Sequence, residues 1–184
     1  MREQALSLLK QYNKNESLVR HALAVEAIMR HFAAEAGEDE EYWGAVGLLH
    51  DLDYEMYPEE HCHRSAELLR DAGYDDAFIH AVVSHGYGLV SDVEPQLYME
   101  KVLYTIDELS GLITATAVLR PSHSLDDLES SSVRKKFKDK RFAAGVNREV
   151  ILNGCAMLGL DLNDVITRCI EGMRRYRGQP PLLG

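Results

Sequence analysis

Apolar residues recur at steps of three and four through almost the whole chain, and this periodicity constrains the fold more than any other feature. It is clearest between Ser17 and Ala36, where a stripe is formed by Leu18, Ala22, Val25, Met29, Phe32 and Ala36. Such spacing puts apolar side chains on one face of an α-helix. No segment shows the strict alternation that is typical of a β-strand. The sequence therefore predicts an all-α protein.

Breaks at Gly, Pro and Asn divide this pattern into separate helices. The predicted helices span 2–12, 17–36, 42–52, 60–72, 77–84, 96–119, 147–158 and 163–176. The helix at 96–119 could be broken near Ser110 and Gly111. A Ser/Asp-rich connection is expected at 122–132 and a strongly basic run at 134–141, while the Pro/Gly-rich tail at 178–184 should be frayed.

Length and charge limit the functional classes that this chain can belong to. With 184 residues, it can bury one good core. Its formal net charge of −10 disfavours a nucleic acid polymer as partner, because such binders carry a basic face. No apolar run is long enough to span a membrane, and the N-terminus lacks a secretory signal. We therefore expect a cytoplasmic protein whose three cysteines are reduced thiols.

The stretch from Gly44 to Asp53 is apolar almost to its end and then presents His50 and Asp51 side by side. Imidazole and carboxylate groups are common ligands of divalent metals. Gly44 and Gly47 weaken the predicted helix, but they allow another backbone to approach closely. The pair therefore indicates a metal site at a point of close packing.

Three predicted helices each place a polar residue on an otherwise apolar face: His21, His50 with Asp51, and Asp107. A buried carboxylate is costly unless a cation or several donors surround it. One shared metal ion would satisfy all four side chains at once.

The ordered set of His21, His50, Asp51 and Asp107 resembles the motif of the HD-domain superfamily of metal-dependent phosphohydrolases. The segments that carry the resemblance are LVRHALAV at 18–25, GLLHDLDY at 47–54 and YTIDELSG at 104–111. The chain is most similar to the bacterial single-domain subgroup that is called HDIG-type. The resemblance implies an HD-domain helical bundle with additional C-terminal helices. In that interpretation 1–184 is a single domain, with a metal-binding core at about 16–120 and a helical extension at about 133–177.

The resemblance also implies the metal ligands. His21, His50, Asp51 and Asp107 would hold one divalent ion, which could be Mn, Fe, Zn, Mg or Co. A second ion is possible in some members of the family, and here its ligands would be His61 and His85, with Asp51 as the bridge. His61 and His63 would point about 200° apart on a helix that included both, and the apolar pattern favours His61 as the inward one.

The expected chemistry follows from such a site. A bound ion lowers the pKa of a water ligand and thereby produces hydroxide that attacks the phosphorus. Asp51, Asp53 and Arg20 are the candidate catalytic residues, and Arg64 and Lys101 the candidate substrate-binding residues. Asp53, Glu100 and Glu108 could instead orient the histidine ligands. The basic run at 134–141 is interpreted as a solvated face, with a lid over an anionic substrate as the alternative. His31, His80 and His123 have no predicted role.

The leading prediction is thus a phosphohydrolase of a small phosphorylated substrate, for example a nucleotide. One alternative is a di-iron HD-domain oxygenase, which requires both metal positions. Another is a non-catalytic nucleotide-binding regulatory module, although the intact ligand set argues against it. The sequence leaves the substrate, the physiological metal and the oligomeric state open.

Overall fold

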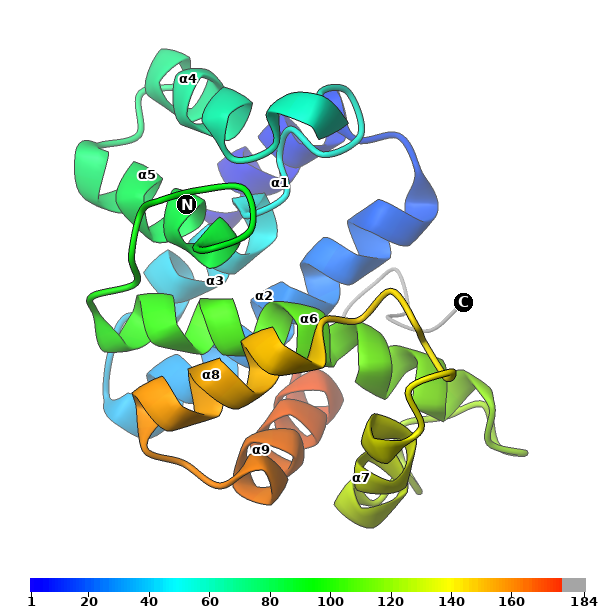
Figure 1. The fold of residues 1–184 in the computed structure, drawn as a ribbon. Helices are drawn as coiled ribbons and strands as arrows, with labels where there is room; N and C mark the ends of the chain where they lie inside the picture. The colour runs from blue at the N-terminus through cyan, green and yellow to red at the C-terminus, as the bar shows by residue number, and fades with distance from the viewer. Residues whose placement is uncertain (177–184) are drawn as a thin grey trace.

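The computed structural model describes residues 1–176, and over this range the chain is all-α, as predicted (Figure 1). The α-helices are α1 (Arg2–Tyr12), α2 (Glu16–Ala36), α3 (Glu40–Leu49), α4 (His63–Asp71), α5 (Asp76–Val83), α6 (Tyr98–Val118), α7 (Ser130–Lys138), α8 (Arg148–Leu158) and α9 (Leu162–Arg175). Two short 3₁₀ helices, η1 (Pro58–Glu60) and η2 (Ser84–Gly86), lie beside α4 and α5. The predicted frayed tail at 178–184, like residue 177 of the predicted extension, lies outside the described residues.

Helix α2 lies at the centre of the molecule. Every residue from Ala22 to Met29 is buried, because α3, α6 and α9 pack around this helix. Glu26 is the charged exception, and its carboxylate accepts hydrogen bonds from Arg2 and Arg30. The helix begins where the Asn15 side chain accepts a hydrogen bond from the Ser17 amide, and it ends at Gly37 with a φ of 71°. The central position of α2 places His21, near its N-terminal end, close to several other elements.

Helix α6 runs unbroken through Ser110 and Gly111, so the possible break there was wrong. The Ser110 hydroxyl donates to the Asp107 carbonyl oxygen one turn earlier, which satisfies this buried group within the helix. At the other end of α6, the Glu100 carboxylate accepts hydrogen bonds from the amides of Gln96 and Leu97. Glu100 thus caps the helix, and its histidine partner is His80 rather than a member of the predicted metal set.

Two predicted helices have different boundaries in the structure. Helix α3 ends at Leu49, so Asp51 and Leu52 belong to the turn that follows it. The helix predicted to begin at Glu60 begins only at His63, because Cys62 has a φ of 69° that interrupts helical geometry. Helix α7 was missed, since its sequence shows mainly a basic run; Val133 alone is fully buried in it.

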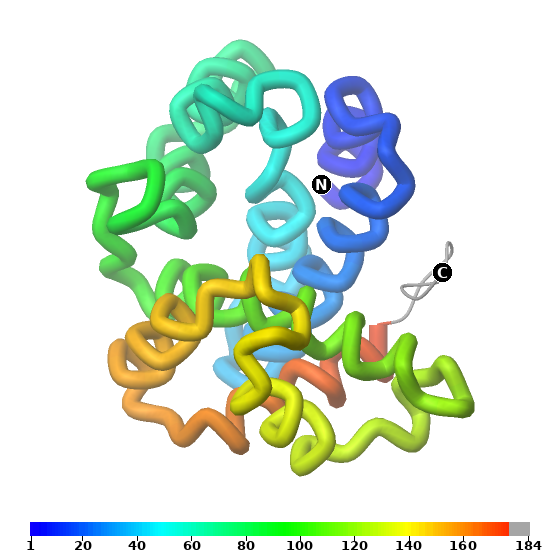
Figure 2. The backbone as a smooth tube through the Cα atoms, turned by 45° about the vertical axis from the view of Figure 1, so that its right-hand side comes forward, coloured from blue at the N-terminus to red at the C-terminus, as the bar shows by residue number. Residues whose placement is uncertain are grey.

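The C-terminal helices pack against the first part of the chain. Helix α8 lies along α6, and α9 lies against α2, as both views of the backbone show (Figures 1 and 2). The contacts are close: a Cβ at Gly154 would overlap with Thr105 Oγ1, and one at Gly172 would meet the Cα of Ile28 at 3.1 Å. In residues 1–176 no single helix is long and apolar enough to cross a membrane, although α8 and α9, bent by 98°, would meet the criteria as a pair.

Candidate metal centre

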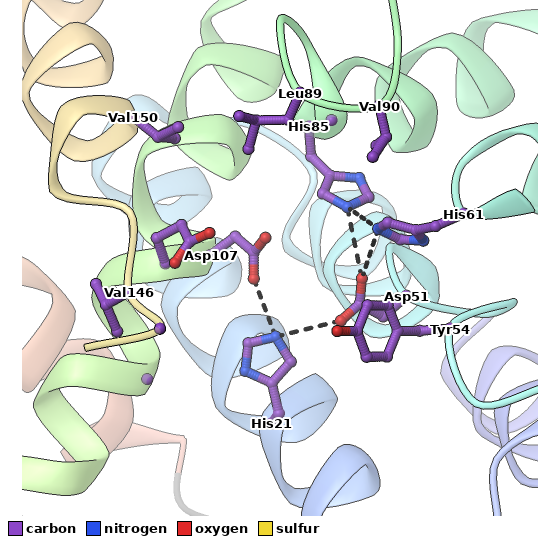
Figure 3. Close-up of a pocket in the computed structure, with 14 residues that line it drawn as sticks. His21, Asp51, Tyr54, His61, His85, Leu89, Val90, Asp107, Val146 and Val150 are labelled. Carbon is purple, nitrogen blue, oxygen red and sulfur yellow. Dashed lines mark hydrogen bonds and ion pairs between the residues drawn. The ribbon is translucent and has the colours of Figure 1, made fainter. Parts of the chain in front are cut away.

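The four side chains of the predicted metal set meet in one place. Figure 3 shows three of them, His21, Asp51 and Asp107. His21 projects from α2, Asp107 projects from α6, and His50 and Asp51 follow the end of α3. His21 Nε2 lies 2.9 Å from Asp107 Oδ1 and 3.1 Å from His50 Nε2. Asp51 Oδ2 lies 3.3 Å from His50 Nε2 and 3.6 Å from His21 Nε2. We call these four residues the first cluster.

The other oxygen of Asp51 faces a second pair of histidines. His61 comes from the turn before α4, and His85 from η2. Asp51 Oδ1 lies 3.4 Å from His61 Nε2 and 3.5 Å from His85 Nε2, and the two nitrogens are 3.2 Å apart. His61, His85 and Asp51 form the second cluster, which shares Asp51 with the first. Cys62 Sγ lies behind it, 4.0 Å from His85 Nε2.

The backbone and neighbouring side chains fix the direction of each histidine. The Nδ1 atoms of His50 and His85 donate to the carbonyl oxygens of Gly47 and Val82, at 2.8 and 2.6 Å. His61 Nδ1 is bound by Asp53 Oδ1 at 2.7 Å. For His21, the Ser110 hydroxyl lies 3.4 Å from Nδ1. All four rings therefore turn Nε2 towards the clusters, which is how metal-ligating histidines are oriented by their outer partners.

The clusters are strongly polarised by their own charges. Burial lowers the pKa of His50, but the Asp51 and Asp107 carboxylates outweigh it and raise the pKa to about 10. Burial likewise lowers the pKa of His61, whereas the bond to Asp53 contributes to raising it to about 9. Burial opposes ionisation of Asp51, yet the neighbouring His50 holds the pKa of this carboxyl well below its usual range. The centre is thus a buried anionic site that attracts cations, either protons or metal ions.

The donor set fits divalent metal ions. With Nδ1 of His50, His61 and His85 acting as donors, their Nε2 atoms carry lone pairs when the rings are neutral. Neutral rings would therefore bring nitrogen lone pairs within 3.2 Å of each other in the second cluster. A cation between the rings removes this repulsion. Imidazole together with carboxylate suits Mn, Fe, Co and Zn more than Mg, which prefers oxygen ligands and water.

A cavity of about 340 Å³ opens onto both clusters, and its wall adds residues that the sequence did not identify. Tyr54 lies in the wall with its ring edge against His61, and apolar side chains form the rim: Leu89, Val90, Val146 and Val150 (Figure 3). No periodic pattern marks Tyr54, Leu89 or Val146, because all three lie in turns or loops. Glu108, which the sequence suggested as an orienting group, lines the cavity, and its Oε2 accepts from the Asn147 amide.

The predicted catalytic and substrate-binding cations do not line this cavity. Arg20 pairs with Glu16 and faces a separate groove beside α1, while Arg64 pairs with Glu67 and stacks over Tyr57. Lys101 is also absent from the wall, and over the described residues no Lys or Arg belongs to it. None of these three cations belongs to the wall of the cavity, so the roles expected for Arg20, Arg64 and Lys101 stay predictions.

Two further predicted residues are placed plainly by the structure. Asp53 is fully buried, and its second oxygen accepts from the Ser65 amide at 2.7 Å, so it lies behind His61 and not in the cavity. His63 is exposed at the start of α4 and lines no part of the cavity. The choice of His61 over His63 agrees with this placement, although its premise of a helix through both was wrong.

The remaining histidines lie away from both clusters. His80 binds Glu100, and His123 Nδ1 donates to the Val118 carbonyl oxygen. His31 is buried near Glu35 and Glu171, against the ring of Phe32. None of the three lines the cavity.

Comparison with known proteins identifies a family whose matched segment contains both clusters. The model of the HD domain family matches residues 18–112, which is more than half of the chain and includes all members of both clusters. The chain belongs to the HD domain family. The HD domain is the mark of a superfamily of metal-dependent phosphohydrolases. The His/Asp centre is therefore a candidate metal-binding site of a metal-dependent hydrolase.

One curated relative contains a segment that is similar to this chain. Ribonuclease Y from Chloroflexus aurantiacus is 30% identical over 100 residues, which cover 52% of this chain and 19% of the relative. The chain thus matches about a fifth of the length of that protein. No solved structure matches significantly.

Proposed function

We propose that this chain hydrolyses a small phosphorylated substrate, for example a nucleotide, at two divalent metal ions that share Asp51. The observation that carries the proposal is the division of Asp51: one oxygen faces His21 and His50, and the other faces His61 and His85. A carboxylate between two sets of ligands is the arrangement that a two-metal hydrolytic site needs. The same geometry supports His21, His50, Asp51 and Asp107 for the first ion and His61, His85 and Asp51 for the second.

When bound, such ions activate water as a nucleophile and polarise a phosphoryl oxygen. The chain contributes the positions. Asp51 and Asp107 supply the negative charge that holds the ions, and Asp53 keeps His61 in place from behind. Leu89 and Val146 give the cavity an apolar rim. Because no Lys or Arg lines the described cavity, the charge of the phosphoryl group would be balanced by the ions themselves. Asp53 is therefore a positioning residue, and Arg20 has no role in the proposed reaction.

Hydrolysis of RNA is a second candidate, because the curated relative is a ribonuclease. Two observations oppose it: the net charge of −10 and the lack of cations in the described cavity. Polymer binding relies on several Lys or Arg contacts to phosphates. The di-iron oxygenase remains an alternative that the same ligands could serve, and a regulatory module would bind ligand without turnover.

The test begins with protein purified without chelator. Elemental analysis should give close to two ions per chain, and Mn²⁺-loaded protein should release phosphate from at least one member of a panel of nucleotides and sugar phosphates. Asp51→Ala should lose both ions and all turnover, while Asp92→Ala, an exposed loop residue, should keep both. Normal metal content in Asp51→Ala would exclude the shared site. Oxygen consumption by the reduced iron form without phosphate release would favour the oxygenase instead, and faster cleavage of an RNA oligonucleotide would favour a ribonuclease.

A further inference from the structure

A second, larger cavity adjoins the metal cavity. This neighbour has a volume of about 650 Å³ and lies between the loop after η2 and helices α6 and α8. Leu89 and Val150 belong to the walls of both cavities, so they form the junction. A molecule that has one end at the metal clusters and extends past these two side chains would reach the second cavity. Combined, the two spaces are of the size that small-molecule sites usually have.

The junction is apolar and partly open. Leu89 is 56% exposed and the adjacent Val90 is 44% exposed, which is unusual for large apolar side chains beside a charged centre. Val150 faces them from α8, and Val146 from the loop before it (Figure 3). Exposed apolar groups that surround a cleft are typical of a ligand-binding surface. The side chains at the junction thus favour contact with an uncharged part of a ligand.

Beyond the junction the wall is aromatic and amide-rich. Tyr87 contributes a half-buried ring, Tyr104 is only 4% exposed, and the Asn153 amide lies beside the Tyr104 hydroxyl. Rings of this kind pack well against planar groups, and an amide can both donate and accept hydrogen bonds. The chemistry suits an aromatic or heteroaromatic body.

The charges in the walls of the two cavities disfavour a second anionic group on the ligand. The described walls of both cavities contain no Lys or Arg, but they contain the carboxylates of Glu108 and Glu149. A further phosphate or carboxylate on the ligand would be desolvated at the junction and would find no opposite charge beyond it. Only the group held at the metal clusters can carry negative charge without this penalty.

We infer that the second cavity is the subsite for the organic part of the substrate, and that the substrate is a phosphomonoester with one phosphoryl group and an uncharged, aromatic or heteroaromatic body. A nucleoside monophosphate meets this description, whereas a nucleoside polyphosphate or an RNA chain does not. The inference rests on the proposed function, because it places the phosphoryl group at the metal clusters.

The test uses phosphonates, which cannot be hydrolysed and so report binding alone. Isothermal titration of the Mn²⁺-loaded protein compares methylphosphonate, phenylphosphonate and 4-phosphonobenzoate. Phenylphosphonate should bind at least tenfold more tightly than methylphosphonate, because its ring reaches the junction. 4-Phosphonobenzoate should lose about tenfold relative to phenylphosphonate, because its carboxylate enters a wall without cations.

Two variants test whether the preference for the phenyl group arises at the junction. Leu89→Asp should abolish the advantage of the phenyl group, measured as the ratio of the methylphosphonate and phenylphosphonate dissociation constants in that variant. Leu97→Asp is the matched control, since Leu97 is 60% exposed and lines neither cavity. Equal binding of the methyl and phenyl compounds, or a preserved phenyl advantage in Leu89→Asp, would overturn the inference. Tighter binding of 4-phosphonobenzoate or of a short RNA would do the same. A phenyl preference in a protein that hydrolyses no phosphomonoester would instead remove the proposed function and leave the subsite in place.

Discussion

At the scale of single residues, the environment of Asp53 decides its role. The sequence places it two residues after Asp51, close enough to suggest a catalytic carboxylate. In the structure it is fully buried, and its two oxygens bind His61 Nδ1 and the Ser65 amide. A carboxylate behind a ligating histidine fixes the ring and raises its basicity. Asp53 therefore acts on the second cluster through His61.

We predict that Asp53→Asn lowers the affinity for the ion at His61 and His85 by about 10- to 100-fold. The charge that holds the His61 ring is lost, while the shape of the side chain is kept. Competition with a chromophoric chelator gives both dissociation constants. The ion at His21 and His50 should change by less than about threefold, and Asp71→Asn, an exposed residue at the end of α4, should change neither. Equal loss at both positions would contradict a local role for Asp53.

A second prediction at this scale concerns pH. In the metal-free protein the pKa values of His50 and His61 are raised to about 10 and about 9, so both rings are protonated at neutral pH. Metal ligation requires neutral rings. Metal uptake at pH 7 should therefore release protons, and affinity should rise as pH increases from about 6 towards 9. Titration calorimetry in two buffers of different ionisation enthalpy measures the number released; buffer-independent heats would contradict the prediction.

At the scale of elements, the close crossing of α2 and α3 brings the first cluster together. A Cβ at Gly47 would meet Met29 Cγ at 2.9 Å and the Val25 carbonyl oxygen at 3.2 Å. The expectation that this glycine allows a backbone to approach closely is confirmed. Because His21 lies on α2 and His50 directly follows α3, the separation of these helices sets the distance between two proposed ligands of the same ion.

We predict that Gly47→Ala destabilises the protein by up to about 2 kcal/mol, because a steric cost of about 1–3 kcal/mol is offset by a gain in helix propensity of about 1 kcal/mol. Metal affinity should fall with it. Gly111→Ala in α6 is the matched control for stability: a Cβ there meets nothing within 4 Å, so the variant should be neutral or more stable by up to about 1 kcal/mol. Urea denaturation of the two variants checks both signs, and similar stabilities would disprove the packing argument.

The loop between α7 and α8 is held by one side chain. The Arg148 guanidinium donates to six backbone carbonyl oxygens, at distances of 2.6–3.4 Å, from Lys136, Phe137, Asp139, Phe142, Ala143 and Val146. The same loop supplies Gly145 and Val146 to the cavity wall. Arg148 therefore maintains this wall without touching the metal clusters.

Arg148→Ala should cost about 1.5–3 kcal/mol, the usual value of hydrogen bonds to a charged group. Amides at 139–147 should exchange hydrogen faster, and phosphonate affinity should fall, while metal content stays normal. Hydrogen exchange read by mass spectrometry locates the change. Arg141→Ala is the control, because that side chain is 97% exposed. Unchanged exchange at 139–147 in Arg148→Ala would show that the loop is held by other contacts.

At the scale of the whole molecule, one hydrophobic core spans the matched family segment and the helices that follow it. Val133 in α7, Ile151 in α8 and Val165 in α9 are fully buried and join the cluster that contains Val25 and Ile106. The family match ends at residue 112, within α6. The described part of the C-terminal extension thus covers α2 and α6, the helices that carry His21 and Asp107.

We predict that a chain truncated after Ser132 is insoluble or unfolded, because apolar surface on α2 and α6 would lose its cover and the second cavity would lose its α8 wall. Circular dichroism and size-exclusion chromatography of the fragment 1–132 check this. Limited proteolysis of the full chain should likewise give no stable core that ends near residue 132. A soluble fragment that binds two metal ions would contradict it and would mark the extension as a separate unit.

The sequence by itself determined the helical class and the first cluster. Helical periodicity is a local property, so α2, α5 and α6 were predicted within a few residues of their boundaries. His21, His50 and Asp107 stand out as polar residues on apolar faces, and that pattern is also local. What remained open was which charged side chains near these ligands line the cavity. Arg20, Arg64 and Lys101 lie within a few residues of predicted ligands in the sequence, yet none of them lines the cavity.

Only the tertiary structure decided the rest of the site. The family resemblance named His61, His85 and Asp51 as possible ligands, but their meeting depends on the backbone turns at Cys62 and at η2. Such turns depend on long-range packing instead of residue spacing. The apolar rim joins the loop after η2 to a loop more than fifty residues later, so no local pattern could reveal it. Contacts between distant segments form only when the core assembles, and in this protein they decide the second cluster and the space for the substrate.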